Sequence, residues 1–254
     1  MNLLLLEPDE LGPDGSASLR GRRHQHAREI LRAQAGQTLR VGVRGGLTGT
    51  AVVRVASADV LELAVKLSEP PPPRLGVDLV LAIPRPKALK RVVPAIASLG
   101  VDRLVLVNAA RVEKSYFDSK VLAQAFLAGL VDLGLEQARD TVAPEIEVRD
   151  RLKPFVEDEL DGWAKDARRL LPHPTAARAL EPVEPGQRVA LAIGPDGGWV
   201  PYEVELFERA GFSPVSLGPR VLRVEVAVPA VLGAVRSRCP KDAWPGSLDL
   251  GGFD

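Results

Sequence analysis

Two glycine-containing loops near the end of the chain are the stretches most able to hold a ligand. The first follows an apolar run at 188–193 and reads Gly194-Pro195-Asp196-Gly197-Gly198, and the second contains Gly218-Pro219 after the run at 213–217. Glycine lets the main chain turn sharply and lets a ligand approach it, because it has no side chain. Ligands of open α/β sheets bind beyond the carboxyl ends of strands. Two ordinary turns are the alternative interpretation.

Neither loop has a standard phosphate-binding pattern. The first lacks both the Lys-Ser/Thr of a P-loop and the spacing of a dinucleotide fingerprint. The three histidines, His24, His26 and His173, have no metal-ligand spacing with cysteine or carboxylates, so no metal is expected. His173 is interpreted as part of a surface turn, with a place beside the first glycine loop as the alternative. Cys239 has no obvious base partner that would make it a nucleophile.

The elements that must position these loops follow a strand–helix alternation after residue 76. Apolar runs predict buried strands at 77–83, 102–109, 167–173, 188–194 and 213–218. Helical periodicity predicts helices at 86–100, 118–139 and 201–211. This alternation is typical of an α/β sheet that is mostly parallel.

The first seventy residues have a different pattern, with one helix among strands. Residues 22–37 are predicted to be helical, and 38–57 to form two strands around Gly45-Gly46. A third strand is predicted at 59–67, and a small closed barrel follows from these elements. Four prolines at 70–73 mark a stiff connector. We therefore expect domains at 1–69 and 76–240, followed by a tail at 241–254.

Composition limits the possible partners and compartments. The 254 residues carry 33 basic and 33 acidic side chains, so nucleic-acid binding requires a local basic patch. One candidate patch lies at the first helix, with Arg22, Arg23, His24 and Arg28, although a solvated helix face is the alternative. A second lies at Arg85 and Lys87. A single cysteine and a short apolar start predict a soluble cytoplasmic protein with no membrane span.

The complete string around the loops resembles a known family. "AIGPDGGW" followed by "GFSPVSLGPRVLRVEVA" resembles the C-terminal signature of the RsmE family, 16S rRNA uridine-N3 methyltransferases of the SPOUT superfamily. Upstream, "RHQHAREILRAQAGQTLRVG", "LGVDRLVLVNAARVEKS" and "GLEQARDTVAPEIEV" resemble further family segments in the same order. The resemblance therefore covers nearly the whole chain.

The resemblance implies a PUA-like β-barrel followed by an α/β SPOUT domain with a trefoil knot. It also implies a homodimer, a 16S rRNA or small-subunit partner, and S-adenosylmethionine held by the two loops. The cofactor residues expected from it are Ile193, Gly194, Pro195, Gly197, Gly198, Leu217, Gly218, Pro219, Val221, Leu222 and Arg223.

Arg223 and Glu225 match the arginine and glutamate of the family's signature, which implies catalytic roles for both. N3 of uracil is a poor nucleophile until its proton leaves, so a base or a nearby cation would help. The alternative is an intrachain ion pair, with Glu225 favoured by the helix dipole. Two family threonines are replaced by Val224 and Val226, and Pro229 follows early in the helix.

Three functions remain open from the sequence. The first is methylation of N3 of a 16S rRNA uridine, and the second is a SPOUT methyltransferase with another RNA target. The third is an RNA-binding protein whose catalytic site has decayed, which the lost threonines would favour. Cofactor binding separates the third from the others, and mapping of the modified nucleotide separates the first two.

Overall fold

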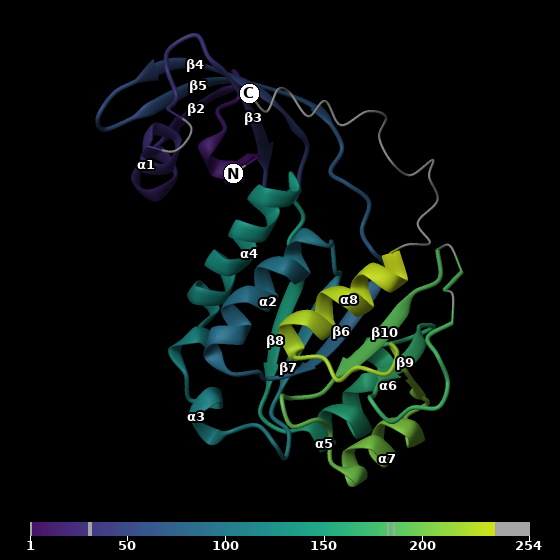
Figure 1. Cartoon of the computed structure of the whole chain (residues 1–254). Helices are drawn as coiled ribbons and strands as arrows, with labels where there is room; N and C mark the ends of the chain where they lie inside the picture. Colours follow the sequence, from purple (N-terminus) through teal and green to yellow (C-terminus); the bar gives the residue numbers. More distant parts are fainter. Residues whose placement is uncertain (1, 30–31, 182, 185, 237–254) are drawn as a thin grey trace.

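The chain forms two sheet-based units, which Figure 1 shows one above the other. The computed structural model describes residues 2–29, 32–181, 183–184 and 186–236. The proline run lies between the last strand of the first sheet, which ends at Glu69, and the first central strand of the second, which begins at Val77. The predicted tail at 241–254 lies outside the described residues.

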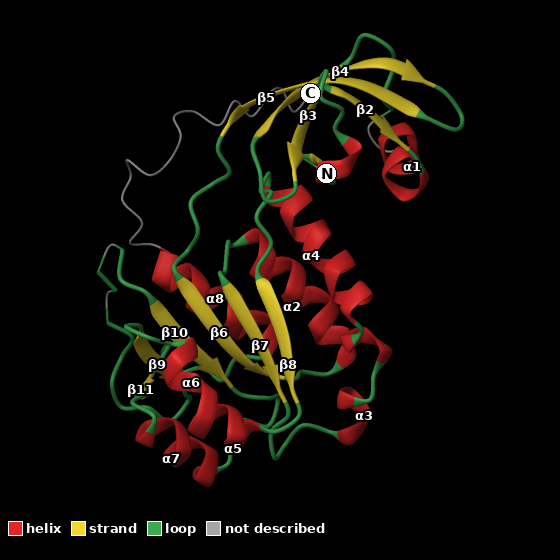
Figure 2. Ribbon diagram, turned by 180° about the vertical axis from the view of Figure 1, so that it is seen from behind, coloured by secondary structure: helices red, strands yellow, loops and turns green. Residues whose placement is uncertain are grey.

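The N-terminal unit is a curled five-stranded sheet with one helix. Its strands are β1 (Leu4–Leu6), β2 (Ser16–Leu19), β3 (Thr38–Val43), β4 (Thr48–Ala56) and β5 (Leu61–Glu69). They follow the order β1-β3-β4-β5-β2, so β1 and β2 lie at the edges and the sheet is a half-barrel rather than the closed barrel expected (Figure 2). Helix α1 (Gly21–Glu29) and the short turn η1 (Pro8–Glu10) accompany this sheet.

The second unit is a six-stranded parallel sheet. Its strands are β6 (Val77–Ala82), β7 (Arg103–Val107), β8 (Glu145–Arg149), β9 (Arg168–Pro172), β10 (Val189–Ile193) and β11 (Ser213–Val215). The spatial order is β11-β9-β10-β6-β7-β8, and every pairing between neighbours is parallel. All carboxyl ends therefore meet at one edge of the sheet.

Helices cover both faces of this sheet (Figures 1 and 2). One face carries α2 (Pro86–Ser98), α4 (Gln124–Ala138) and α8 (Val224–Arg236), and α2 packs against both of the others. The other carries α5 (Leu152–Pro154), a π-helical turn (Phe155–Glu159), α6 (Leu160–Trp163) and α7 (Pro201–Arg209). The short α3 (Lys114–Phe117) and η2 (Lys120–Leu122) precede α4. No helix in the described part of the chain is long and apolar enough to cross a membrane.

Strand β1 links the two hydrophobic cores. Leu4 and Leu6 are buried in the N-terminal core, whereas Leu3 and Leu5 belong to the core of the α/β unit. Alternate side chains of a strand point to opposite faces, so one short strand supplies both cores. The apolar start of the sequence is therefore a structural strand.

A polar clamp joins the units beside β1. The guanidinium of Arg44 pairs with Glu7 at 3.0 Å and with Asp132 of α4 at 2.7 Å. Burial acts to lower the pKa of Arg44, but the hydrogen bonds to Glu7 and Asp132 outweigh it and raise that pKa. The Thr141 hydroxyl donates to the Gly46 carbonyl at 2.6 Å. These contacts fix the orientation of the N-terminal unit on α4.

Candidate cofactor pocket

Three loops at one sheet edge enclose a pocket of about 450 Å³. They follow β9, β10 and β11, which are direct neighbours in the sheet, so their carboxyl ends lie side by side. The residues that line it are Arg111, Pro172, His173, Pro174, Thr175, Ile193, Gly194, Pro195, Asp196, Gly197, Gly198, Trp199, Pro201, Leu217, Gly218, Arg220, Val221, Leu222, Val224 and Ala227. Both predicted glycine loops therefore contribute to one pocket.

The first loop turns tightly and depends on two glycines. The Gly198 N–H donates to the Pro195 carbonyl at 2.8 Å, and Gly198 has a φ of 72°. A Cβ added to Gly194 would lie 3.0 Å from the backbone nitrogen of Trp199. A side chain at either position would therefore strain the backbone or displace it.

Two arginines from other loops hold this loop in place. Arg85, which precedes α2, donates to the Asp196 carboxylate at 3.1 Å, and Arg111 donates to the Gly197 carbonyl. The hydrogen bond and charge of Asp196 raise the pKa of Arg85, with smaller contributions from Glu225 and Tyr116. The loop is thus tied to segments that follow β6 and β7.

The second loop is shaped by a serine and leads into α8. The Gly218 N–H donates to the Ser216 hydroxyl at 3.1 Å, and Gly218 has a φ of 110°. The N–H groups of Val226 and Ala227 donate to the Arg223 carbonyl at 2.9 and 2.7 Å, which begins α8. The pocket lining therefore continues into the first turn of a helix.

The structure assembles most of the predicted cofactor residues and adds others. Pro219 and Arg223 are the two members of that set that do not line the pocket. Arg111 and Thr175 were not predicted, and His173 lines the pocket although it also forms the expected turn, with Nδ1 2.9 Å from the Thr175 hydroxyl. His173 and Thr175 follow β9, a neighbour of both strands that precede the glycine loops, and that position is the sequence signal that could have found them.

The two candidate catalytic residues differ in burial. Arg223 is exposed, whereas Glu225 is partly buried and its Oε2 has no hydrogen-bond partner among the described residues. No ion pair between Arg223 and Glu225 occurs in the described part of the chain. The intrachain ion pair that was the alternative interpretation is therefore not present there.

The residues predicted to contact RNA fall into two groups. Arg23 donates to the Leu5 carbonyl at 2.7 Å and to Glu10 at 2.5 Å, and buried His24 has Nε2 3.1 Å from the Ser57 carbonyl. Both thus make internal contacts. Arg28, Arg85 and Lys87 are exposed, although Arg85 is also paired with Asp196 and Arg28 lies 3.5 Å from the Ala58 carbonyl. The side chain of Arg22 lies outside the described part of the structure.

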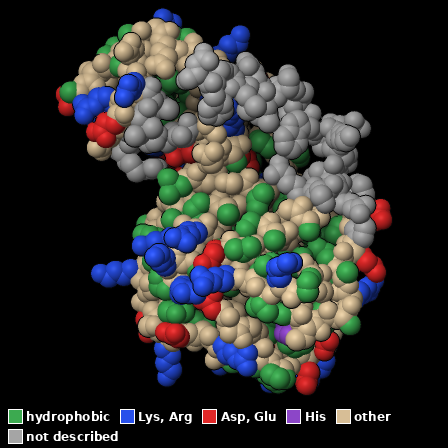
Figure 3. Space-filling view, viewed as in Figure 1, with side chains coloured by type: hydrophobic (Ala, Val, Ile, Leu, Met, Phe, Trp, Pro, Cys, Tyr) green, Lys and Arg blue, Asp and Glu red, His purple; other side chains and the backbone are tan. Residues whose placement is uncertain are grey.

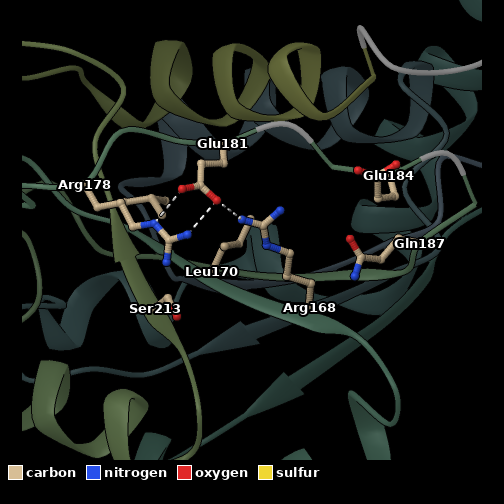
Figure 4. Close-up of a pocket in the computed structure, with 8 residues that line it drawn as sticks. Arg168, Leu170, Arg178, Glu181, Glu184, Gln187 and Ser213 are labelled. Carbon is tan, nitrogen blue, oxygen red and sulfur yellow. Dashed lines mark hydrogen bonds and ion pairs between the residues drawn. The ribbon is translucent and has the colours of Figure 1, made fainter.

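A different pocket of about 470 Å³ lies beside β9 and β11 (Figure 4). In it, Arg178 and Arg168 point toward Glu181 from either side, with Arg178 Nε at 3.1 Å and Arg168 Nη2 at 3.5 Å from its carboxylate. Its basic groups face an acid of the chain itself, and none of the predicted site residues lines it. We therefore regard the glycine-loop pocket as the candidate functional site.

Comparison with known proteins gives the class of this protein, the RNA methyltransferases. The RNA methyltransferase domain family matches residues 71–236. The ribosomal RNA small subunit methyltransferase E of Treponema pallidum is 30% identical, over 96% of this chain and 93% of that protein. The chain belongs to the RsmE family of these methyltransferases.

Solved structures agree with this assignment. The Legionella pneumophila protein Lpg2936, in complex with the bound cofactor SAM, has a TM-score of 0.76 and 26% identity, covering 93% of this chain and 97% of that one. The ribosomal RNA small subunit methyltransferase E of Neisseria gonorrhoeae has a TM-score of 0.77 and 21% identity, and the match covers 94% of this chain and 98% of that one. The latter likeness shows the fold.

Proposed function

We propose that this protein uses S-adenosylmethionine to methylate N3 of a uridine in 16S rRNA. Membership of the RsmE family and the SAM-bound Legionella relative support the proposal. The observation that carries it is the glycine-loop pocket, which is built by three neighbouring loops and contains most of the cofactor residues expected from sequence. We treat 1–69 as the RNA-binding domain and 76–240 as the methyltransferase domain.

The pocket fits the cofactor in size and chemistry. Its volume is within the range of small-molecule sites, and Ile193, Leu217, Val221 and Leu222 provide apolar walls. The glycines of both loops leave main-chain groups accessible to polar atoms of a ligand. When bound, the cofactor supplies a methyl group on a positively charged sulfur. The carboxylate of Asp196 in the pocket lining can interact favourably with that charge.

Glu225 and Arg85 are the residues that we assign to proton removal from the target base. The N3 proton of uracil must leave, and the unpartnered Oε2 of Glu225 can accept it. The role that we propose for Arg85, the cation that holds the first glycine loop through Asp196, is to favour the anionic base electrostatically. Exposed Arg223 is left to contact RNA rather than the cofactor.

The RNA contact surface that we propose centres on α2. Lys87, Lys90 and Arg91 are exposed on this helix, and Figure 3 shows Lys and Arg side chains gathered over α2 and α4. Lys90 also lies over the exposed ring of Phe126, 5.4 Å from its centroid. Arg28 of α1 is a further contact. Such groups bind phosphates without reading sequence.

A homodimer is part of the proposal. Apolar side chains near the pocket are exposed, with Val221 at 81% and Val226 at 49%, and such patches are typical of subunit interfaces. In Figure 1, α1 lies at one end of the molecule, whereas α7, which directly follows the first loop, lies at the other. We propose that the N-terminal unit of a second copy lies close to each pocket. Because we propose an rRNA substrate, we also propose that the protein acts in the cytoplasm.

The proposal is tested by methyl transfer to small ribosomal subunits that lack the modification. Purified protein and radiolabelled S-adenosylmethionine should label 16S rRNA, and mass spectrometry of the digested RNA should find 3-methyluridine. A methyl label on another nucleotide would show that the proposed target is wrong. A protein that binds neither cofactor nor RNA would contradict the enzyme assignment itself.

A further inference from the structure

We infer that a second pocket at the same sheet edge binds an unpaired nucleotide next to the target base. This inference rests on the proposed function. The pocket has a volume of about 270 Å³ and lies beyond the carboxyl ends of β7 and β8. We call it the Tyr202 pocket, lined by Asn108, Asp150, Arg151, Lys153, Tyr202 and Glu203, with apolar side chains around them.

Its position places it next to the cofactor pocket. Trp199 and Pro201 line the cofactor pocket, whereas Val200 and Tyr202 line the Tyr202 pocket. Alternate residues of one segment therefore separate the two spaces. An RNA strand that presents its target base to the first pocket would pass this second one within a nucleotide or two.

The chemistry of the Tyr202 pocket matches a nucleotide. Tyr202 is 46% exposed at the start of α7, where a base can stack on its ring. Aromatic side chains stack on unpaired bases in most single-stranded RNA sites. The side-chain amide of Asn108 makes no hydrogen bond to any described residue, so it can donate to and accept from a base edge.

The charges around this pocket favour a phosphate. Arg151 is exposed and has no ion-pair partner in the described ranges, and Lys153 is only 3.8 Å from Glu157, a distant and exposed pair. Glu203 is buried, and its carboxylate accepts the N–H groups of Ala110 at 2.8 Å and Val200 at 3.0 Å. The negative charge of Glu203 is thus bound by main-chain N–H groups of the protein. Asp150 is the exposed acid that remains at the rim.

The test compares Tyr202→Ala, Tyr202→Phe and Arg151→Ala with Arg209→Ala, a change at the exposed far end of α7. Tyr202→Ala should weaken RNA binding and raise the KM for 16S rRNA about tenfold, since stacking on one aromatic ring has that effect. Tyr202→Phe keeps the ring and should stay within twofold. Arg151→Ala should make the plot of the logarithm of the RNA binding constant against the logarithm of salt concentration less steep, by about one unit of slope.

The controls separate this inference from the proposed function. All variants should bind S-adenosylmethionine as the wild type does, because the Tyr202 pocket is not the cofactor pocket. Wild-type methylation of 16S rRNA tests the proposed function alone. Filter binding of 16S rRNA tests the Tyr202 pocket even without turnover. Equal RNA affinity of Tyr202→Ala and wild type, in protein that melts normally, would overturn the inference.

Discussion

Replacement of Gly198 by valine tests whether the first glycine loop holds the cofactor. Gly198 has a φ of 72°, and no atom lies within 4 Å of a Cβ built on it. Gly36, in the N-terminal unit, has a φ of 86° and is equally open. A valine in this backbone region costs about 1–2 kcal/mol at either site. Gly36→Val is therefore a control matched for backbone strain.

The expected difference between the two variants lies in binding. Gly198 lines the cofactor pocket, so a branched side chain there occupies or reshapes space in which the main chain would approach the ligand. We expect S-adenosylmethionine affinity to fall at least a hundredfold, which corresponds to about 2.8 kcal/mol at 1.4 kcal/mol per tenfold change. Gly36→Val should leave the affinity unchanged.

Titration calorimetry gives the affinity of each variant, and thermal unfolding shows whether both are folded. The two variants should lose similar stability, because their backbone strain is similar. If Gly198→Val binds the cofactor within threefold of wild type while its melting temperature matches that of Gly36→Val, the first loop does not contact the ligand. The pocket would then have to hold the cofactor through its other two loops.

Three further outcomes can be measured. Asp78→Ala should lower the free energy of unfolding by about 2–4 kcal/mol in denaturant titrations, since this buried carboxylate pairs with two arginines at 2.7 and 2.8 Å. Hydrogen bonding to Arg44 lowers the pKa of Glu7 below its ordinary value of 4.5, so the clamp stabilises fully above pH 4.5 and is lost as pH falls through the folded pKa. Arg44→Ala should lower the free energy of unfolding by less than about 1 kcal/mol, because the paired groups are partly exposed. The difference in melting temperature between this variant and the wild type should therefore become smaller in acid. Val226→Asp should give a monomer mass in light scattering, and an unchanged dimer would place the interface elsewhere.

Much of the α/β unit could be predicted from sequence because its central strands are continuously apolar. The runs at 77–83, 102–109, 167–173, 188–194 and 213–218 all contain strands of the sheet. Strand β8 escaped prediction because its sequence, EIEVR, alternates and lies at the sheet edge. The helix predicted at 118–139 is divided into η2 and α4, and α1 ends at Glu29 rather than at 37.

The basic patch shows why local charge counts mislead. From Arg20 to Arg44 the sequence contains one acid, which predicts an exposed positive surface. In the fold, Arg23 pairs with Glu10, and Arg44 pairs with Glu7 and with Asp132, which is 88 residues away. Neutralising partners that come from other elements cannot be seen in a window of sequence.

The order of strands and the packing of α8 on α2 decide which motifs meet. Arg85 precedes α2, Asp196 follows β10, and Glu225 lies in the first turn of α8, so the three are far apart in sequence. Because α8 packs on α2, Glu225 is brought within electrostatic range of Arg85, which in turn holds Asp196. The same guanidinium therefore fixes the first glycine loop and interacts electrostatically with the carboxylate that we assign to proton removal. A change in the α2–α8 packing would disturb the cofactor loop and the acid–base pair together, although neither helix supplies most of the pocket.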